Sequence, residues 1–533
     1  MLLVARVLPR TYRLRYQTPA KRAFHYILEM TTIRMPKRSF SSSPEVEEIK
    51  PVSPRTASKA KSTQKSTTPR KRTKVSPVPG PVPKTAAEEF GDEWLDWPAP
   101  RPAIKAAQEF IKDIAANKRK VLLVPDKDAD GLSAGYVLHK TLELLGLPAD
   151  HIYVHVLSKG TNVHSEAEVN AMERMVDENG IERVVVLDQG SRPGKIVGNL
   201  PDGGKALLLI DHHQSEEFPP DAVVLTACHT SPIATTSLLT YMTCLPLHSN
   251  VQEACDWAAL MGYIGDLGTG TKWGQAPWPA HIAVCSRRYG GKTIADAVGA
   301  VNAPRRTAEY NVKKAWDILL AASEPKEVAL NAWLKLCRLD VNDEIEKWAR
   351  VPPRFSADGR VALLRVDSGF QIHPVIATRW AGTLRNAKTM LMTMCANTGF
   401  NPDPTKVSFS CRVSSGLRHL PDEERPNLIA LLKEYGDSVE GFRERVGDDF
   451  ARGHKEATGG IIHKDEFEKL IVAMGIDENA PRKKASESKS SAKAKSVDPN
   501  QKASVKDFFR VVPRDAEASG ANESKIKDVK PST

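Results

Sequence analysis

Three short apolar segments of the chain are each followed by an aspartate. They are residues 121–125 (VLLVP), 183–187 (RVVVL) and 206–210 (ALLLI), followed by Asp126, Asp188 and Asp211. Because these segments show no polar alternation, they predict strands of a parallel sheet that is covered on both faces. Helical patterns separate them, so residues 86–300 are expected to form a doubly wound α/β domain. The carboxyl ends of its strands share one edge, where the acidic residues are expected to meet.

More residues that can bind a metal stand next to these aspartates. Asp128, Asp130 and Gly131 follow Asp126, His212 and His213 follow Asp211, and a helical segment over 256–268 supplies Asp266. Closely spaced carboxylates repel one another, and a divalent cation is the usual partner that relieves this repulsion. The DADG stretch alone also fits a solvated turn, but three acidic strand ends and Asp266 together favour a metal site. Oxygen and imidazole ligands suit Mn²⁺, Mg²⁺ or Co²⁺ better than a thiolate zinc site does.

Two local patterns refine the first domain. Residues 151–157 (HIYVHVL) predict a further strand, and residues 165–180 predict a helix. Ser165 and Glu168 at its start have the spacing of a capping box, in which each side chain bonds to the other residue's backbone.

Four motifs together resemble those of the DHH phosphoesterase superfamily. They are DKDADG (126–131), VVVLDQG (184–190), LLLIDHHQ (207–214) and GYIGDLG (262–268). The first motif, with three aspartates, is similar to that of the RecJ-like exonuclease branch. The resemblance implies two divalent cations, Mn²⁺ or Mg²⁺, that together activate water for attack at phosphorus.

The same resemblance implies a role for each residue. Asp126 and Asp128 would hold one metal ion, and Asp130 the other, with Asp188 bridging the two. His212 and Asp266 would complete the ligands of the second ion. His213 would orient groups or relay a proton beside Asp188, or simply form a hydrogen bond next to the ligands. Asp211 is expected to bond to the backbone or to the histidines instead of to metal.

Residues 351–475 predict a smaller α/β domain, which follows a helical connector over 301–350. FARGHKEATGG (450–460) resembles the glycine-rich signature of the DHH-associated substrate-binding domain, and VSFSCRVSS (407–415) resembles its arginine-bearing strand. The implied substrate-binding residues are Arg412, Gly453, His454 and Gly459, with Arg379 as a further candidate whose alternative is a salt bridge within the fold. Ala451 and Arg452 replace expected glycines, which alters how closely the backbone can approach a phosphate. The layout is similar to two-domain enzymes that degrade oligonucleotides.

The two ends of the chain are basic and of low complexity. Residues 1–84 contain 19 Lys and Arg against 4 Asp and Glu, and residues 476–533 contain 13 against 9. We expect disorder over 1–85 and 476–533. The remainder is net acidic, so an interface for nucleic acid there requires a local groove. Residues 1–43 have the composition of a mitochondrial transit peptide, whereas PRKRTKV (69–75) is typical of a nuclear import signal.

A short peptide in the C-terminal tail predicts a protein partner. KASVKDFFRVV (502–512) resembles a PIP box, the motif by which proteins bind the sliding clamp PCNA, with Val505, Phe508 and Phe509 as the apolar anchors. Lys502 stands where the usual glutamine is expected. Packing of this segment on the protein's own core is the alternative. The clamp interpretation of 502–509 favours a nuclear location over a mitochondrial one.

These features predict a metal-dependent phosphodiesterase, an exonuclease that degrades single-stranded DNA or RNA from an end in replication or repair. One alternative is a hydrolase of small phosphoanhydrides or polyphosphate, which the GHKEATGG stretch disfavours. The other is a non-catalytic replication scaffold, which the retention of all six ligand positions disfavours. Seven scattered cysteines predict reduced thiols. No segment approaches the roughly 20 apolar residues of a membrane span.

Overall fold

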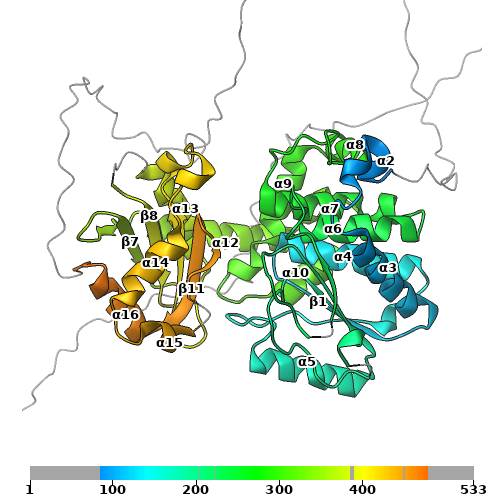
Figure 1. The fold of residues 1–533 in the computed structure, drawn as a ribbon, viewed down its shortest axis with the longest axis horizontal. Helices are drawn as coiled ribbons and strands as arrows, with labels where there is room; N and C mark the ends of the chain where they lie inside the picture. The colour runs from blue at the N-terminus through cyan, green and yellow to red at the C-terminus, as the bar shows by residue number, and fades with distance from the viewer. Residues whose placement is uncertain (1–83, 202, 221, 385–388, 448–449, 478–533) are drawn as a thin grey trace, which may run out of the picture. The chain divides into compact units, whose positions relative to one another are not determined.

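The computed structural model describes residues 84–477, apart from 202, 221, 385–388 and 448–449 (Figure 1). The predicted disordered ends lie outside this range, except for residues 84, 85, 476 and 477. The PIP-like peptide, with Val505, Phe508 and Phe509, also lies outside the described residues.

The first sheet has five parallel strands in the order β2-β1-β3-β4-β5. Their bounds are β1 Val121–Pro125, β2 Ile152–Val154, β3 Arg183–Leu187, β4 Leu207–Asp211 and β5 Val223–Thr226. Every residue of β1, β3 and β4 is buried. The predicted parallel sheet of fully buried strands is therefore confirmed.

Alternate residues of these strands face two separate cores. Leu123 and Val185 pack in a core with helices α3 (Arg101–Ala116), α4 (Ala129–Leu144), α6 (Thr236–Cys244) and α7 (Val251–Leu267). Leu122 and Val184 pack in the other core, to which Met172 of α5 (Glu166–Asn179) belongs. Helices therefore cover both faces, with α4 and α5 on opposite sides of β1 (Figure 1), and the doubly wound prediction is confirmed.

The capping box predicted at the start of α5 is absent. The Ser165 side chain makes no cap hydrogen bond, and its Oγ instead accepts from the Asn162 backbone N–H at 3.0 Å. Glu168 is buried and accepts hydrogen bonds from Ser158 N at 2.9 Å and Thr161 Oγ1 at 2.8 Å. Its other oxygen lies 2.7 Å from His155 Nε2. The prediction was wrong because these contacts with the loop after β2 engage the carboxylate.

Helices α8 (Ala280–Tyr289), α9 (Gly291–Val301), α10 (Val312–Ala321), α11 (Pro325–Leu330) and α12 (Ala332–Trp348) follow the first sheet. Trp316 of α10 belongs to the first core. Val341 of α12 packs with Leu364 of the second sheet. The segment predicted as a connector thus contributes to a core of the first sheet and to a core of the second sheet. The exact domain boundaries remain predictions.

The second sheet has six strands in the order β10-β11-β9-β8-β7-β6. They are β6 Arg354–Phe355, β7 Val361–Val366, β8 Met392–Asn397, β9 Lys406–Val413, β10 Arg452–His454 and β11 Ala457–His463. Only β7 and β8 pair in parallel. The accompanying helices are α13 (His373–Thr383), α14 (Leu428–Asp437), α15 (Phe442–Val446) and α16 (Lys464–Ala473). This confirms a second, smaller α/β fold.

Three further features concern the start of the first domain, the cysteines and the helices. The short helix α2 (Ala86–Phe90) leads to Trp97, which is buried in the first core. All seven cysteines are buried and unpaired. Among the described residues, no helix combines the length and apolar character needed to cross a bilayer.

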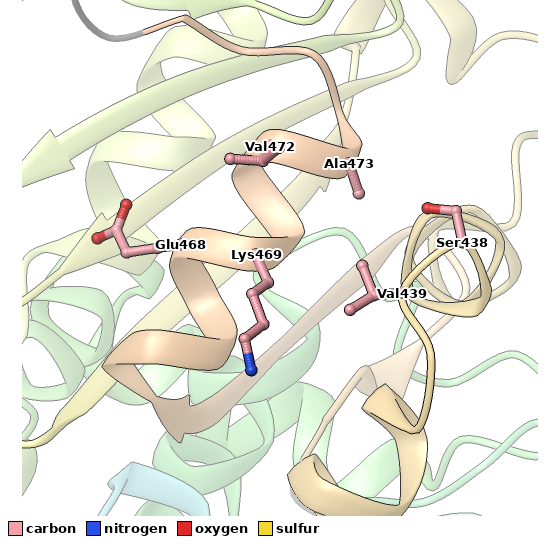
Figure 2. A pocket seen from close by; sticks show the side chains of 6 residues that line it. All are labelled: Ser438, Val439, Glu468, Lys469, Val472 and Ala473. Carbon is pink, nitrogen blue, oxygen red and sulfur yellow. The ribbon is translucent and has the colours of Figure 1, made fainter.

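A surface pocket of about 450 Å³ lies in the second α/β region. Figure 2 shows its lining side chains, four of which come from α16 and two, Ser438 and Val439, from the turn after α14. None of the predicted site residues lines this pocket.

Candidate metal centre

The first acidic group lies between β1 and α4. Asp126 continues the ladder of β1, since its backbone N–H donates to Leu187 O at 2.9 Å. Asp128 is the N-cap of α4, where its carboxylate accepts from Asp130 N at 3.0 Å and Gly131 N at 3.3 Å. A Cβ atom at Gly131 would lie 2.7 Å from the backbone N of Asp126. The tight turn that presents both carboxylates therefore requires glycine.

Asp130 is fully buried in the first turn of α4. Its carboxylate accepts from the backbone N–H groups of Thr236 at 2.8 Å and Ser237 at 3.1 Å, at the start of α6, and from Ser237 Oγ. Burial, and then the negative charge of Asp266, raise the pKa of Asp130 to about 6. The carboxylate is thus held firmly although its charge is disfavoured.

Asp188 follows β3 with φ +65°, in the left-handed region that few residues other than glycine adopt. Aspartate tolerates this conformation better than most residues. Thr236 Oγ1 donates to its Oδ1 at 2.8 Å. Burial and the neighbouring charge of Asp130 raise the pKa of Asp188 well above its usual value. The raised pKa values of Asp130 and Asp188 therefore show that too little positive charge lies nearby to stabilise both buried carboxylates in their ionised form.

His212 lies among these carboxylates. Its Nδ1 is 3.2 Å from Asp188 Oδ1 and 3.6 Å from Asp130 Oδ2, and its Nε2 is 3.2 Å from Asp266 Oδ2. Burial would lower the pKa of His212, but hydrogen bonds to Asp188 and Asp266 raise it to about 11. In the metal-free protein a proton on His212 thus supplies positive charge, and a metal ion bound through this ring would displace it.

Asp211 ends β4 and is fully buried. Its Oδ1 accepts from the backbone N–H groups of His212 and His213, and from His213 Nδ1 at 2.8 Å. Its Oδ2 accepts from Ser191 Oγ at 2.6 Å. The rings of His212 and His213 stack with centroids 4.6 Å apart. Asp211 therefore bonds to the backbone of both histidines and to the ring of His213, and bonds of this kind were predicted.

The six predicted ligands converge in two groups, within each of which the ligand atoms lie within 4.8 Å of one another. One group is Asp126, Asp128 and Asp188, and the other is Asp130, His212 and Asp266. Asp188, Asp211, His212 and His213 form a third, overlapping set. Five carboxylates, two of them buried with raised pKa values, and one imidazole fit the preferences of Mn²⁺ or Mg²⁺.

The predicted substrate-binding residues lie on the second sheet and on α13. Arg412 of β9 and His454 of β10 both pair with Ala457, one on each side of β11. Gly453 pairs with Thr458, and at Gly459 a side chain would overlap the carbonyl of Phe409. Arg412 is partly buried and donates to Ser410 Oγ at 2.9 Å and Cys411 O at 2.8 Å.

Arg379 is exposed on α13 and forms an ion pair with Glu346 at 2.8 Å. This is the salt bridge that the sequence offered as the alternative to a substrate role. Arg379 therefore lies on a helix, whereas Arg412 and His454 lie on strands β9 and β10, on either side of β11.

Sequence reasoning missed a polar segment over 302–310. Asn302 Oδ1 accepts from the backbone N–H of Ala129 at 3.1 Å and from Arg305 Nε at 3.1 Å. Arg305 Nη2 lies 3.6 Å from Asp128 Oδ2. The adjacent arginines in APRRTAEY were the available signal, but only the fold brings them to the metal centre.

Residues 120–263 match the protein-family model described as the DHH family, N-terminal domain. No curated protein matches the sequence significantly. Among solved structures, the DHH domain of a protein described as a member of a ribosomal-protein family has 13% identity and a TM-score of 0.51, over 74% of this chain and 92% of that one. This likeness concerns the fold alone.

Two more solved structures have lower TM-scores. RecJ from Thermus thermophilus in complex with Mn²⁺ has 15% identity and a TM-score of 0.48, over 70% of this chain and 54% of that one. The chain therefore spans about half the length of that RecJ. CDC45 from Entamoeba histolytica has 10% identity and a TM-score of 0.40, over 70% of this chain and 98% of that one.

Proposed function

We propose that the chain, whose residues 120–263 match the model of the DHH family's N-terminal domain, is a divalent-metal-dependent phosphodiesterase. We further propose that it is an exonuclease acting on single-stranded DNA or RNA. The observation that carries the proposal is the convergence of six predicted ligands into two adjoining groups. Structural scaffolding alone gives no reason to bury several carboxylates side by side.

Two divalent cations would be held by these groups, one by Asp126 and Asp128, the other by Asp130, His212 and Asp266, with Asp188 between them. Bound there, they would supply Lewis-acid activation of water and neutralise charge at phosphorus. The chain's own residues fix the ligands in place. Thr236 and Ser237 hold Asp188 and Asp130, and the strained backbone at residue 188 aims its carboxylate.

His213 is proposed to move a proton during the reaction. Partial desolvation of the ring would lower its pKa, but the hydrogen bond and charge of Asp211 raise the pKa. Asp211 engages Nδ1, so Nε2 is left to exchange a proton with the departing oxygen of the substrate. The His213 side chain is 52% exposed, so an incoming substrate can reach it.

Arg412 and His454 are proposed to bind a phosphate near the end of the strand being degraded. Both pair with Ala457, on either side of β11, and the Arg412 guanidinium already has two of its donors engaged. This fixes its orientation for a planar contact with a phosphate. Recognition of an end would favour exonuclease over endonuclease cleavage.

Digestion of end-labelled single-stranded DNA and RNA with Mn²⁺ tests this function. We expect release of mononucleotides by the wild-type protein and none by Asp188→Asn, in which asparagine tolerates the positive φ. Release of phosphate from pyrophosphate alone would favour the small-molecule alternative. No hydrolysis of any substrate would favour the scaffold, and undiminished cleavage in chelator would refute the metal mechanism.

The clamp partner rests on the peptide 502–509, and the nuclear location rests on this peptide and on PRKRTKV (69–75). We propose that Val505, Phe508 and Phe509 bind PCNA. Capture of the full chain by immobilised PCNA, lost in a Phe508→Ala/Phe509→Ala variant, is the expected result. Equal capture of the variant would refute this assignment without affecting the proposed chemistry.

A further inference from the structure

The segment 302–310 contains two polar groups that are short of partners. Among the described residues, the guanidinium of Arg306 has no hydrogen-bond or ion-pair partner, although the residue is partly buried. The hydroxyl of Tyr310 is buried and makes no hydrogen bond to any described residue. Buried polar groups are nearly always bonded, and leaving one unbonded costs about 1–3 kcal/mol. The buried hydroxyl and the partly buried guanidinium, four residues apart, therefore leave hydrogen-bond donors that a ligand can take up.

The backbone at Tyr310 is held in a conformation that large side chains rarely adopt. Its φ is +53°, in the left-handed region. Its N–H donates to Thr307 Oγ1 at 3.2 Å, and its carbonyl accepts from Val312 N at 3.1 Å. For an aromatic residue this conformation is strained, and such strain gathers at functional sites. The surrounding bonds thus fix the Tyr310 ring at an energetic cost.

The segment is attached directly to the metal centre. Asn302 accepts a hydrogen bond from Ala129 and another from Arg305, and Arg305 lies 3.6 Å from the carboxylate of Asp128. The charges of Lys127 and Asp126 also act on Tyr310, whose pKa is raised chiefly by burial. Arg306 and Tyr310 therefore belong to the surroundings of the first acidic group.

Charge supplies the reason for a cation at this place. The five ligand carboxylates and Asp211 carry six negative charges, which two divalent cations, Lys127 and Arg305 would only balance, so Arg306 adds a positive charge beyond that balance. Lys127 and Arg305 each face a carboxylate of the centre, at 3.3 Å and 3.6 Å. Arg306 has no such partner among the residues that the structure describes. Burial and the charge of Arg305 lower the pKa of Arg306 to about 10, so it still carries a positive charge at neutral pH.

We propose that Arg306 and Tyr310 form a phosphoryl-binding subsite beside the metal centre. The guanidinium contacts two oxygens of a phosphate adjoining the scissile one, and the Tyr310 hydroxyl donates a third hydrogen bond to it. The ligand is either an internal phosphodiester or a terminal phosphate, since both offer the same oxygens. This inference rests on the proposed function and adds to it a contact from the segment between the two sheets.

Hydrolysis of matched substrates tests the subsite. Bis-p-nitrophenyl phosphate contains a single phosphodiester and no neighbouring phosphate, whereas a twelve-residue oligonucleotide contains many. Arg306→Gln and Tyr310→Phe are expected to raise KM for the oligonucleotide about tenfold or more, the effect of losing a hydrogen bond to a charged group. Both variants are expected to match the wild type on the small diester.

Two comparisons complete this experiment. Arg338→Gln and Tyr153→Phe are control variants, because Arg338 is exposed on α12 and pairs with Asp296, and Tyr153 lies on β2. Oligonucleotides with a terminal phosphate or a terminal hydroxyl identify the ligand. A defect confined to the phosphorylated form assigns the subsite to a terminal phosphate, and an equal defect on both assigns it to an internal one.

The outcomes separate the subsite from the proposed function. Equal loss on the small diester and the oligonucleotide, or no loss on either, overturns the subsite. If the wild-type protein hydrolyses neither substrate, the proposed function fails, and fluorescence anisotropy of a labelled oligonucleotide in chelator decides the subsite. Arg306→Gln is then expected to bind about tenfold more weakly than Arg338→Gln. Equal binding of the two variants overturns the subsite.

Discussion

A methyl group added at Gly262 is expected to disrupt the metal centre. Gly262 lies in the middle of α7, and a Cβ atom there would come within 2.6 Å of Ser237 Cβ and 2.9 Å of Asp130 Oδ1, and would overlap Ser237 Oγ. In an open helix, replacing glycine by alanine stabilises a protein by about 1 kcal/mol. Here, overpacking costs about 1–3 kcal/mol, and loss of the Ser237 bond to the buried carboxylate costs about 1.5–3 kcal/mol more.

The net expectation for Gly262→Ala is a loss of about 2–5 kcal/mol in the free energy of unfolding, together with weaker manganese binding. Urea unfolding in chelator measures the first effect, and the shift of the unfolding midpoint on adding Mn²⁺ measures the second. Gly270→Ala is the matched control, because nothing lies within 4 Å of its Cβ position. A Gly262→Ala protein as stable as the wild type, with the same manganese shift, would refute this reasoning.

Three further predictions concern buried acids and the ion pair on α13. Burial raises the pKa of Asp256 to about 6 despite the charge of Arg288, so the folded state loses stability as the pH rises through 4–6. The free energy of unfolding of Asp256→Asn should exceed that of the wild type by about 2–3 kcal/mol at pH 8 and match it at pH 4. Equal stabilities at pH 8 would contradict this. Burial would raise the pKa of Glu168, but hydrogen bonds from His155 and Ser158 lower it to about 2. The stabilisation that the Glu168 carboxylate gives the folded state is therefore present above pH 4.5 and lost below it. Relative to Glu168→Gln, the wild type should lose about 3 kcal/mol between pH 5 and pH 2 in urea unfolding, and parallel profiles would exclude this role. Arg379→Gln should change oligonucleotide hydrolysis less than twofold, because the variant loses only an exposed ion pair with Glu346, and such pairs contribute about 0–1 kcal/mol to stability. A tenfold rise in KM would instead assign Arg379 a role in substrate binding.

The first sheet could be predicted because its strands are unusually apolar. Continuous runs such as residues 183–187 have no solvent-facing side, so a parallel sheet with helices on both faces is the arrangement that buries them. The metal ligands could be predicted because the carboxyl ends of parallel strands meet at one edge. Residue type and strand position alone therefore placed Asp126, Asp188 and Asp211 near one another.

Features that depend on contacts distant in sequence were missed. Residues 151–157 were predicted as a strand, but β2 stops at Val154, and His155 contacts Glu168. That same contact engages the side chain that the capping box required. Tyr310 was not singled out, because a left-handed tyrosine has no sequence signature and three of the charged groups that act on it, Lys127, Asp126 and Glu168, are more than 140 positions away.

Two glycines, Gly131 and Gly262, show which close contacts can be inferred from the sequence and which cannot. Gly131 ends the DKDADG motif, and the 2.7 Å approach of its Cβ position to the Asp126 backbone gives the reason for glycine there. No close contact was predicted at Gly262, although it allows α7 to approach Asp130 and Ser237 closely. Local chain geometry can be inferred from a motif, whereas close packing between helices needs the fold.

Calorimetric titration of the full-length protein with Mn²⁺ tests the central claim most directly. We expect two cations bound per wild-type chain, with release of protons because metal binding displaces the proton of His212. Asp188→Asn should bind at most one cation tightly. Equal binding by the wild-type and Asp188→Asn proteins, or no binding by either, would contradict the assignment of these six side chains to a two-metal centre.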